Sequence, residues 1–176
     1  MEYRICILGN PGSGKTTLAK ALSEKFDLPI FHLDREFLVG NFEPLAEEER
    51  IARHRAQIKK KSWIIDGNYR NPEFPERIKE ADLVIFLDTS RVVTVPRVLL
   101  RTVMSGQDLK TIPEGAIPSS LSWEFLKYLL TCNRRKILRE LKIICKTENT
   151  KLLVLKNQPV SKMVSEVAAY LKLATK

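Results

Sequence analysis

The sequence predicts a three-layer α/β fold, in which a parallel sheet is covered by helices on both faces. Five short apolar runs alternate along the chain with segments of helical periodicity, without repeats, linkers or low-complexity tracts. Each apolar run is almost uninterrupted, which is typical of strands buried on both faces of a parallel sheet. The chain has 176 residues, enough for one well-buried domain of this kind. We therefore expect a single domain over residues 1–176.

Apolar spacing, proline and glycine set the order of the predicted elements. Pro29 ends the first helix, because it disfavours helical geometry at Leu28. Pro44 is expected at the first position of the second helix, where a missing N–H costs nothing. Residues 105–120, with two glycines and two prolines, are expected to form a loop. The strands are expected at 3–8, 30–33, 62–65, 83–87 and 151–155, and the helices at 17–26, 44–61, 90–104, 122–146 and 160–173. A further short element is expected around 75–80.

The ends of the predicted strands are mostly polar, although a purely structural sheet would not need polar residues there. Ligands of open parallel sheets bind at the carboxyl ends of the strands. The sequence therefore predicts a binding site at that edge, near Gly9, Asp34, Asp66, Asp88 and Asn157.

A phosphate-binding motif (Walker A) lies between the first predicted strand and the first predicted helix. It reads G-x-x-x-x-G-K-T, and the strand-to-helix context is the one that such a loop requires. Its glycines let the backbone bend tightly and aim N–H groups at a phosphate, while the helix N-terminus adds its positive dipole end. Lys15 is expected to bridge the β- and γ-phosphates of ATP, and the Thr16 hydroxyl to hold Mg²⁺. The motif consists of Gly9, Asn10, Pro11, Gly12, Ser13, Gly14, Lys15 and Thr16.

Charge is unevenly distributed along a chain whose net charge is +9. Residues 91–146 contain eleven Lys and Arg but four Asp and Glu. Such a segment indicates a polyanionic ligand, either the triphosphate itself or a nucleic acid, unless it forms a plain solvated basic face. Within it, a row of basic residues at helical spacing is formed by Arg135, Arg139, Lys142 and Lys146.

Three cysteines, Cys6, Cys132 and Cys145, have no metal-ligand spacing, so reduced thiols in the cytoplasm are expected. No apolar stretch is long enough to cross a bilayer. The first strand starts close to Met1, and we expect no signal peptide. His32 and His54 lack partners at ligand spacing and are expected to be structural.

Together, these segments resemble those of P-loop nucleotide kinases, and in particular the FlaR-type "DNA topology modulation" proteins, which are similar to adenylate kinases. The matching segments are 9–17, 32–34, 63–69 and 81–88. The resemblance implies the P-loop NTPase fold with five parallel strands in the order 2-3-1-4-5. It also implies a short helical lid at about 102–121 and an acceptor-side region at about 34–61.

The same resemblance implies roles for individual residues. Asp66 would hold the water shell of Mg²⁺, Arg101 would contact the transferring phosphate, and Arg134 or Arg135 would complete a charge clamp. Nucleotide contacts are implied for Thr17, Arg97, Asn157 and Pro159, and acceptor contacts for Arg35, Gly67, Asn68 and Arg70.

The chain departs from adenylate kinases where the acceptor binds. Phe74 stands where those enzymes read the acceptor base with a glutamine, and the second strand ends in Asp34. A carboxylate there resembles kinases of small hydroxylated molecules, in which it accepts a proton from the attacking hydroxyl. Asp34 is therefore expected to be a general base, with a helix-capping role or an Mg²⁺ contact through water as alternatives.

The predicted function is that of an ATP- and Mg²⁺-dependent phosphotransferase acting on a nucleotide or a small hydroxylated acceptor. We expect a monomer or a weak homodimer in the cytoplasm. The alternatives are a nucleic-acid-binding protein with incidental ATPase activity and a small regulatory NTPase.

Overall fold

The computed structural model describes residues 2–39, 43–69, 73–104 and 123–174. Its main sheet has five parallel strands, in the spatial order β2 (Ile30–His32), β5 (Trp63–Asp66), β1 (Arg4–Gly9), β6 (Leu83–Asp88) and β7 (Leu152–Lys156). In chain order these are the second, third, first, fourth and fifth predicted strands, so the predicted sheet order is confirmed.

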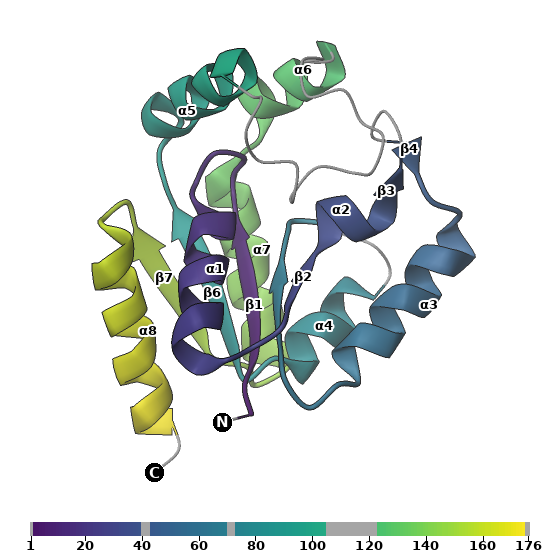
Figure 1. Cartoon of the computed structure of the whole chain (residues 1–176), viewed down its shortest axis with the longest axis vertical. Coiled ribbons are helices and arrows are strands. Elements are labelled where there is room, and N and C mark those ends of the chain that lie inside the picture. Colours follow the sequence, from purple (N-terminus) through teal and green to yellow (C-terminus); the bar gives the residue numbers. More distant parts are fainter. Residues whose placement is uncertain (1, 40–42, 70–72, 105–122, 175–176) are drawn as a thin grey trace.

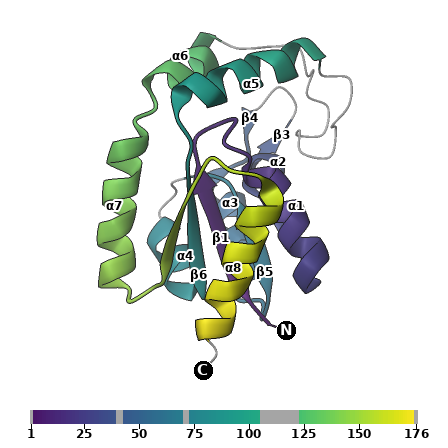
Figure 2. The same cartoon turned by 90° about the vertical axis from the view of Figure 1, so that its left-hand side faces the viewer.

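Helices cover both faces of the sheet (Figures 1 and 2). Successive side chains of β1 belong alternately to two buried clusters, one on each face. Ile5 and Ile7 pack toward α1 (Lys15–Phe26) and α8 (Val160–Ala174). Cys6 and Leu8 pack in a second cluster, which includes residues of α3 (Glu47–Ile58), α4 (Phe74–Glu80) and α7 (Arg134–Thr147). The predicted three-layer architecture is therefore confirmed.

Two further helices, α5 (Arg91–Met104) and α6 (Trp123–Thr131), lie beyond the carboxyl edge of the sheet in both views (Figures 1 and 2). The predicted lid at 102–121 lies outside the described residues except for the last turn of α5.

The expectation of a single helix over 122–146 is wrong, because this segment is divided between two helices, α6 and α7. Asn133 is the N-cap of α7, and its Oδ1 accepts hydrogen bonds from the backbone N–H groups of Arg135 (3.1 Å) and Lys136 (3.2 Å). An asparagine side chain that bonds its own backbone in this way favours a helix start over a helix interior. Leu130, near the end of α6, is 54% exposed, whereas Leu141 in α7 is buried.

The segment between β2 and α3 also differs from expectation. The second strand ends at His32, and Leu33–Phe37 forms the short helix α2, so that Asp34 lies in a helix and not at a strand end. One helical turn puts Leu33 and Phe37 on the same side, and both are fully buried. Burial of this pair accounts for the helix where a strand end was expected.

Pro44 does not begin a helix. It lies in the two-residue strand β4 (Glu43–Pro44), which pairs antiparallel with β3 (Leu38–Val39) in a small second sheet. Proline is tolerated in such a short edge strand, where its missing N–H removes no interior hydrogen bond. Helix α3 begins three residues later at Glu47 and still has three acidic residues in its first turn.

Candidate active site

The loop between β1 and α1 depends on glycines for its shape. Gly12 and Gly14 have positive φ angles of 75° and 95°, which other residues rarely adopt. A Cβ at Gly12 would lie 2.6 Å from the carbonyl oxygen of Thr94 and 2.8 Å from Cγ2 of Val98. The loop is thus packed directly against α5, and Gly12 leaves no space for a side chain.

Helix α1 begins immediately after this loop without a side-chain cap. Its N-cap is Gly14, which offers no side chain, and no acidic residue lies in the first turn. The N–H groups of that turn and the positive end of the helix dipole are therefore available to an anion such as phosphate.

The ammonium group of Lys15 lies against the same loop. Its Nζ donates to the carbonyl oxygen of Gly9 (3.0 Å) and to that of Asn10 (3.2 Å). A lysine ammonium has three donors, so these two bonds leave one for a ligand.

Thr16 and Asp66, predicted independently to bind Mg²⁺, are in direct contact. The Thr16 hydroxyl donates to Oδ2 of Asp66 over 2.8 Å. Asp66 is only 5% exposed, and its other oxygen, Oδ1, is buried with no hydrogen-bond partner among the described residues. A hydroxyl and a buried carboxylate oxygen fit the preference of Mg²⁺ for oxygen ligands, directly or through water.

The described residues contain no group of three or more His, Cys, Asp and Glu that could enclose a metal ion. In nucleotide sites, Mg²⁺ takes most of its ligands from phosphates and water. When bound, the ion would neutralise charge on the phosphates.

His32 belongs to this site, although the sequence predicted a structural role for it. Its Nδ1 lies 3.1 Å from Oδ2 of Asp66, at the carboxyl end of β2. The expectation for His54 fits its surroundings better, because it is fully buried in α3 against the ring of Phe37. Burial, together with the smaller effect of the Arg77 cation, lowers the pKa of His54 to about 4.

The residues after β5 bind the phosphate loop rather than projecting into solvent. The Gly67 N–H donates to the carbonyl oxygen of Ile7 (3.2 Å), and the side chain of Asn68 bonds both backbone polar groups of Gly9. Both residues were predicted to contact the acceptor. Arg70, the third member of that prediction, lies outside the described residues.

The predicted charge clamp lies only partly within the described residues. Nη1 of Arg134 lies 2.7 Å from Oδ1 of Asp88, at the end of β6 and beside β1, whereas the side chain of Arg135 is exposed. Arg97 is exposed on α5, and the Arg101 side chain lies outside the described residues. Of the two arginines predicted for the clamp, the structure thus brings Arg134 to the strand ends.

The chain matches the model of a known family. The model of the ATPase family associated with various cellular activities (AAA) matches residues 5–97, more than half of the chain, including β1, the phosphate loop, Asp66 and Asp88. The chain belongs to the AAA family.

Named relatives of this AAA-family chain fall into two groups. It is 29% identical to a tRNA dimethylallyltransferase of Synechococcus sp. (strain CC9605) over 67% of this chain and 38% of that protein. It is 31% identical to an adenylate kinase of Bartonella tribocorum over 46% of this chain and 40% of that protein. The chain thus spans less than half the length of these curated relatives.

Solved structures similar to this AAA-family chain include two kinases. A gluconokinase from Sinorhizobium meliloti 1021 superposes with a TM-score of 0.59 at 18% identity, covering 99% of this chain and 96% of that one. A shikimate kinase from Aquifex aeolicus superposes with a TM-score of 0.58 at 20% identity, covering 96% of each chain. At these identities the likeness shows the P-loop kinase fold. The narrower resemblance to FlaR-type proteins stays a prediction.

A contact missed by the sequence connects the junction of α6 and α7 with the phosphate loop of this AAA-family chain. The Cys132 thiol lies 3.4 Å from Oδ1 of Asn10, and the guanidinium of Arg91 donates to the Cys132 carbonyl oxygen. No local pattern signals this contact, because the two partners are 122 residues apart.

The remaining predicted site residues lie at the margins of the described site. The Asp34 side chain lies outside the described residues, and Arg35 is exposed on α2. Asn157 and Pro159 are exposed in the turn between β7 and α8. Their predicted contacts with ligands are not tested by these positions.

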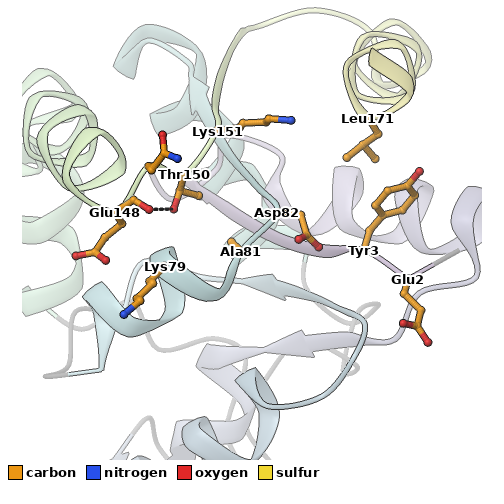
Figure 3. Close-up of a pocket in the computed structure, with 10 residues that line it drawn as sticks. Glu2, Tyr3, Lys79, Ala81, Asp82, Glu148, Thr150, Lys151 and Leu171 are labelled. Carbon is orange, nitrogen blue, oxygen red and sulfur yellow. Dashed lines mark hydrogen bonds between the residues drawn. The ribbon is translucent and has the colours of Figure 1, made fainter. Parts of the chain in front are cut away.

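A separate hollow of about 360 Å³ lies at the opposite edge of the sheet (Figure 3). Its lining comes from the amino ends of β1, β6 and β7 and from adjacent turns, and includes Lys79, Asp82, Glu148 and Lys151. It contains charges of both signs and none of the phosphate-loop residues. This hollow is therefore separate from the candidate site at the phosphate loop.

Proposed function

We propose that this protein is an ATP- and Mg²⁺-dependent phosphotransferase that moves the γ-phosphate to a nucleotide or a small hydroxylated acceptor. The observation that carries the proposal is the convergence of Lys15, Thr16 and Asp66 beside the uncapped N-terminus of α1. These groups supply a cation for phosphate oxygens and oxygen ligands for Mg²⁺.

Phosphoryl transfer asks the protein mainly to position the reactants and to stabilise negative charge. In this proposal the α1 N-terminus and Lys15 hold the triphosphate, with Thr17, Asn157 and Pro159 near the nucleotide. Arg97, Arg101 and Arg134 add positive charge. A lid at about 102–121 would exclude water, which limits hydrolysis of ATP.

The acceptor side is proposed to lie between α2, α3 and the end of β5. There the Tyr69 ring packs edge-to-face on Phe37 (5.2 Å between centroids), and the Arg50 guanidinium lies 5.2 Å from the Tyr69 centroid. An aromatic wall with a nearby cation suits a small polar acceptor better than an apolar one. The fold shared with a gluconokinase and a shikimate kinase supports the same class of acceptor.

A screen of acceptors tests the proposal. ADP formation from Mg·ATP is measured with sugars, hydroxy acids and nucleoside monophosphates, beside a thermal-shift assay with the same compounds. We expect at least one acceptor to raise ADP formation well above the rate with water, and Lys15→Ala to abolish the increase. ADP formation that no acceptor stimulates, together with no stabilisation by Mg·ATP, would contradict the proposal.

A second candidate function, nucleic-acid binding, is favoured by the surface of α7. Arg135, Arg139, Lys142 and Lys146 are all exposed on that helix. Helix α7 runs along the sheet away from the phosphate loop, so its later turns are remote from a nucleotide clamp (Figure 2). The matched tRNA dimethylallyltransferases are named for a nucleic-acid substrate.

The salt dependence of nucleic-acid affinity distinguishes whether the row of basic residues on α7 binds nucleic acid or the nucleotide. If it binds nucleic acid, duplex DNA or RNA affinity falls steeply with salt, and Arg135→Ala with Arg139→Ala lowers the logarithmic slope by about two. If the charges serve the nucleotide, the same double variant raises the KM for ATP and nucleic-acid binding stays weak at physiological salt.

The proposed setting is the cytoplasm, as a monomer or weak homodimer. Cys6, Cys132 and Cys145 are buried and unpaired, which suits a reducing compartment. Among the described residues, no helix combines the length and the apolarity needed to cross a bilayer.

A further inference from the structure

Among the described residues, the amide nitrogen and oxygen of Asn68 both bond one residue of the phosphate loop, Gly9. Its Nδ2 donates to the carbonyl oxygen of Gly9 over 2.6 Å, and its Oδ1 accepts from the Gly9 N–H over 3.0 Å. Asn68 comes directly after the turn that follows Asp66, whereas Gly9 opens the phosphate loop. One side-chain amide thus joins the Mg²⁺ side of the site to the phosphate side.

Sheet geometry explains why the amide fits there. β1 and β5 are parallel with Ile7 opposite Asp66, and the last backbone bond between them runs from the Gly67 N–H to the Ile7 carbonyl oxygen. The next step of the ladder would pair Gly9 with the backbone after Gly67, but the chain turns away at Gly67, where φ is 142°. The Asn68 amide, with one donor face and one acceptor oxygen, takes both positions of the missing peptide partner.

Lys15 depends on the same carbonyl group. The Gly9 carbonyl oxygen accepts from Nδ2 of Asn68 and from Nζ of Lys15, which uses both of its lone pairs. The second Lys15 bond goes to the Asn10 carbonyl oxygen, and no third partner of its ammonium lies among the described residues. The orientation of the Gly9 peptide group therefore decides where the remaining N–H of Lys15 points.

We propose that Asn68 is a positioning residue: its amide fixes the Gly9 carbonyl group, and through it directs the Lys15 ammonium toward the transferring phosphate. The inference rests on the proposed function, because it assumes that Lys15 binds the phosphates of ATP. If Asn68 only stabilised the fold, its replacement would change Mg·ATP affinity by the same factor whether or not Lys15 is present.

The first test compares two isosteric changes of equal charge. Asn68→Asp keeps the acceptor for the Gly9 N–H but sets a carboxylate oxygen against the Gly9 carbonyl oxygen. Asn149→Asp makes the same change in an exposed turn at the opposite edge of the sheet. We expect Asn68→Asp to weaken Mg·ATP binding about tenfold by calorimetric titration, and Asn149→Asp to leave it unchanged. Wild-type affinity in Asn68→Asp would overturn the inference.

The second test asks whether Asn68 acts through Lys15. Mg·ATP affinity is measured for Asn68→Ala, Lys15→Ala and the double variant, with the melting temperature of each as a check on folding. We expect Asn68→Ala to lose about tenfold in affinity alone and almost nothing further in the Lys15→Ala background. The same fold-loss in both backgrounds would overturn the positioning role. Unchanged affinity in Lys15→Ala alone would instead contradict the proposed function itself.

Discussion

The carboxyl and amino edges of the sheet are formed by the same strands, but the polar side chains at the two edges differ in burial and in their interaction partners. At the carboxyl edge, Asp66 is 5% exposed and has one oxygen without a partner among the described residues. At the amino edge, the Arg4 guanidinium lies 2.6 Å from Glu80 and 3.6 Å from Asp82, and all three side chains are about one third exposed or more. The polar groups of the amino edge satisfy one another, whereas those of the carboxyl edge leave capacity for a ligand.

This contrast shows which property identifies a binding site here. The hollow at the amino edge has volume, but its charges are of both signs and solvated. The phosphate loop has positive φ angles and leads into an uncapped helix, and the nearby Asp66 has a buried oxygen without a partner among the described residues; such features are costly without a ligand. These features of the phosphate loop and Asp66, and not the size of a cavity, are the basis for the proposed site.

The largest expected effect distinguishes the two edges directly. Lys15→Ala should lower ATP turnover by about 3 kcal/mol of transition-state stabilisation or more, because it removes the cation from the phosphates. Lys79→Ala, which removes a lysine from the amino-edge hollow, is the matched control and should leave turnover unchanged. Steady-state turnover of Lys15→Ala within tenfold of wild type would contradict the assignment.

The variant Asp34→Asn tests whether Asp34 takes part in transfer of the phosphate to the acceptor. If Asp34 is a general base, Asp34→Asn keeps ATP affinity and loses about 10²–10⁴-fold in transfer to the acceptor. If Asp34 only stabilises α2, transfer survives and stability falls by about 1 kcal/mol. If it holds Mg²⁺ through water, added metal partly restores the rate. ATP affinity, melting temperature and acceptor-dependent turnover on one variant separate these results.

The buried side chain of His54 on α3 makes the folding stability depend on pH. His54 is neutral in the folded protein, since its pKa falls from 6.5 to about 4. Below pH 6.5 the unfolded chain binds more protons than the folded one, so stability should fall by about 2 kcal/mol as the pH drops to about 4.5. Denaturant unfolding at several pH values measures this, and a slope in His54→Gln equal to that of wild type would refute it.

The variant Asp66→Asn tests whether Asp66, at the carboxyl edge, helps to bind Mg²⁺. The amide keeps the shape but loses the charge that faces the Mg²⁺ position. We expect the Mg²⁺ concentration needed for half-maximal turnover to rise about 10–100-fold. An unchanged magnesium requirement, measured at saturating ATP, would remove Asp66 from the metal site.

The smallest expected effect is at the amino edge. Asp82→Ala removes an ion pair with Arg4 and an acceptor for the Arg4 N–H, which lies 2.7 Å from Oδ2. Because the pair is partly exposed, we expect a loss of about 1 kcal/mol in unfolding free energy and no change in ATP turnover. A tenfold loss of turnover would break the contrast between the edges.

The fold and the phosphate half of the site could be predicted because their signals are local. A strand, a glycine-rich turn and a helix start are adjacent in the chain, and the rule that parallel strands carry ligands at their carboxyl ends places Asp66 beside Thr16. The two residues, 50 positions apart, are in contact through the Thr16 hydroxyl, and their binding of Mg²⁺ stays a prediction.

The rest of the site depends on tertiary packing that no local pattern encodes. His32 and Cys132 reach Asp66 and Asn10 only because distant elements are folded together. The break at Asn133 had a local capping signal, but apolar spacing on both sides of it suggested one continuous helix. Asp34 entered a helix because burial of the flanking Leu33 and Phe37 outweighed the strand pattern before it.

Amide chemical shifts during an Mg·ATP titration test the central claim most directly, because they locate the ligand on one edge of the sheet. We predict that the largest changes fall on the phosphate loop from Gly9 to Thr16 and on Asp66, with little change at Asp82 and Thr150. The largest changes at Asp82, Thr150 and their neighbours in the amino-edge hollow, or no changes at the phosphate loop at saturating Mg·ATP, would contradict it.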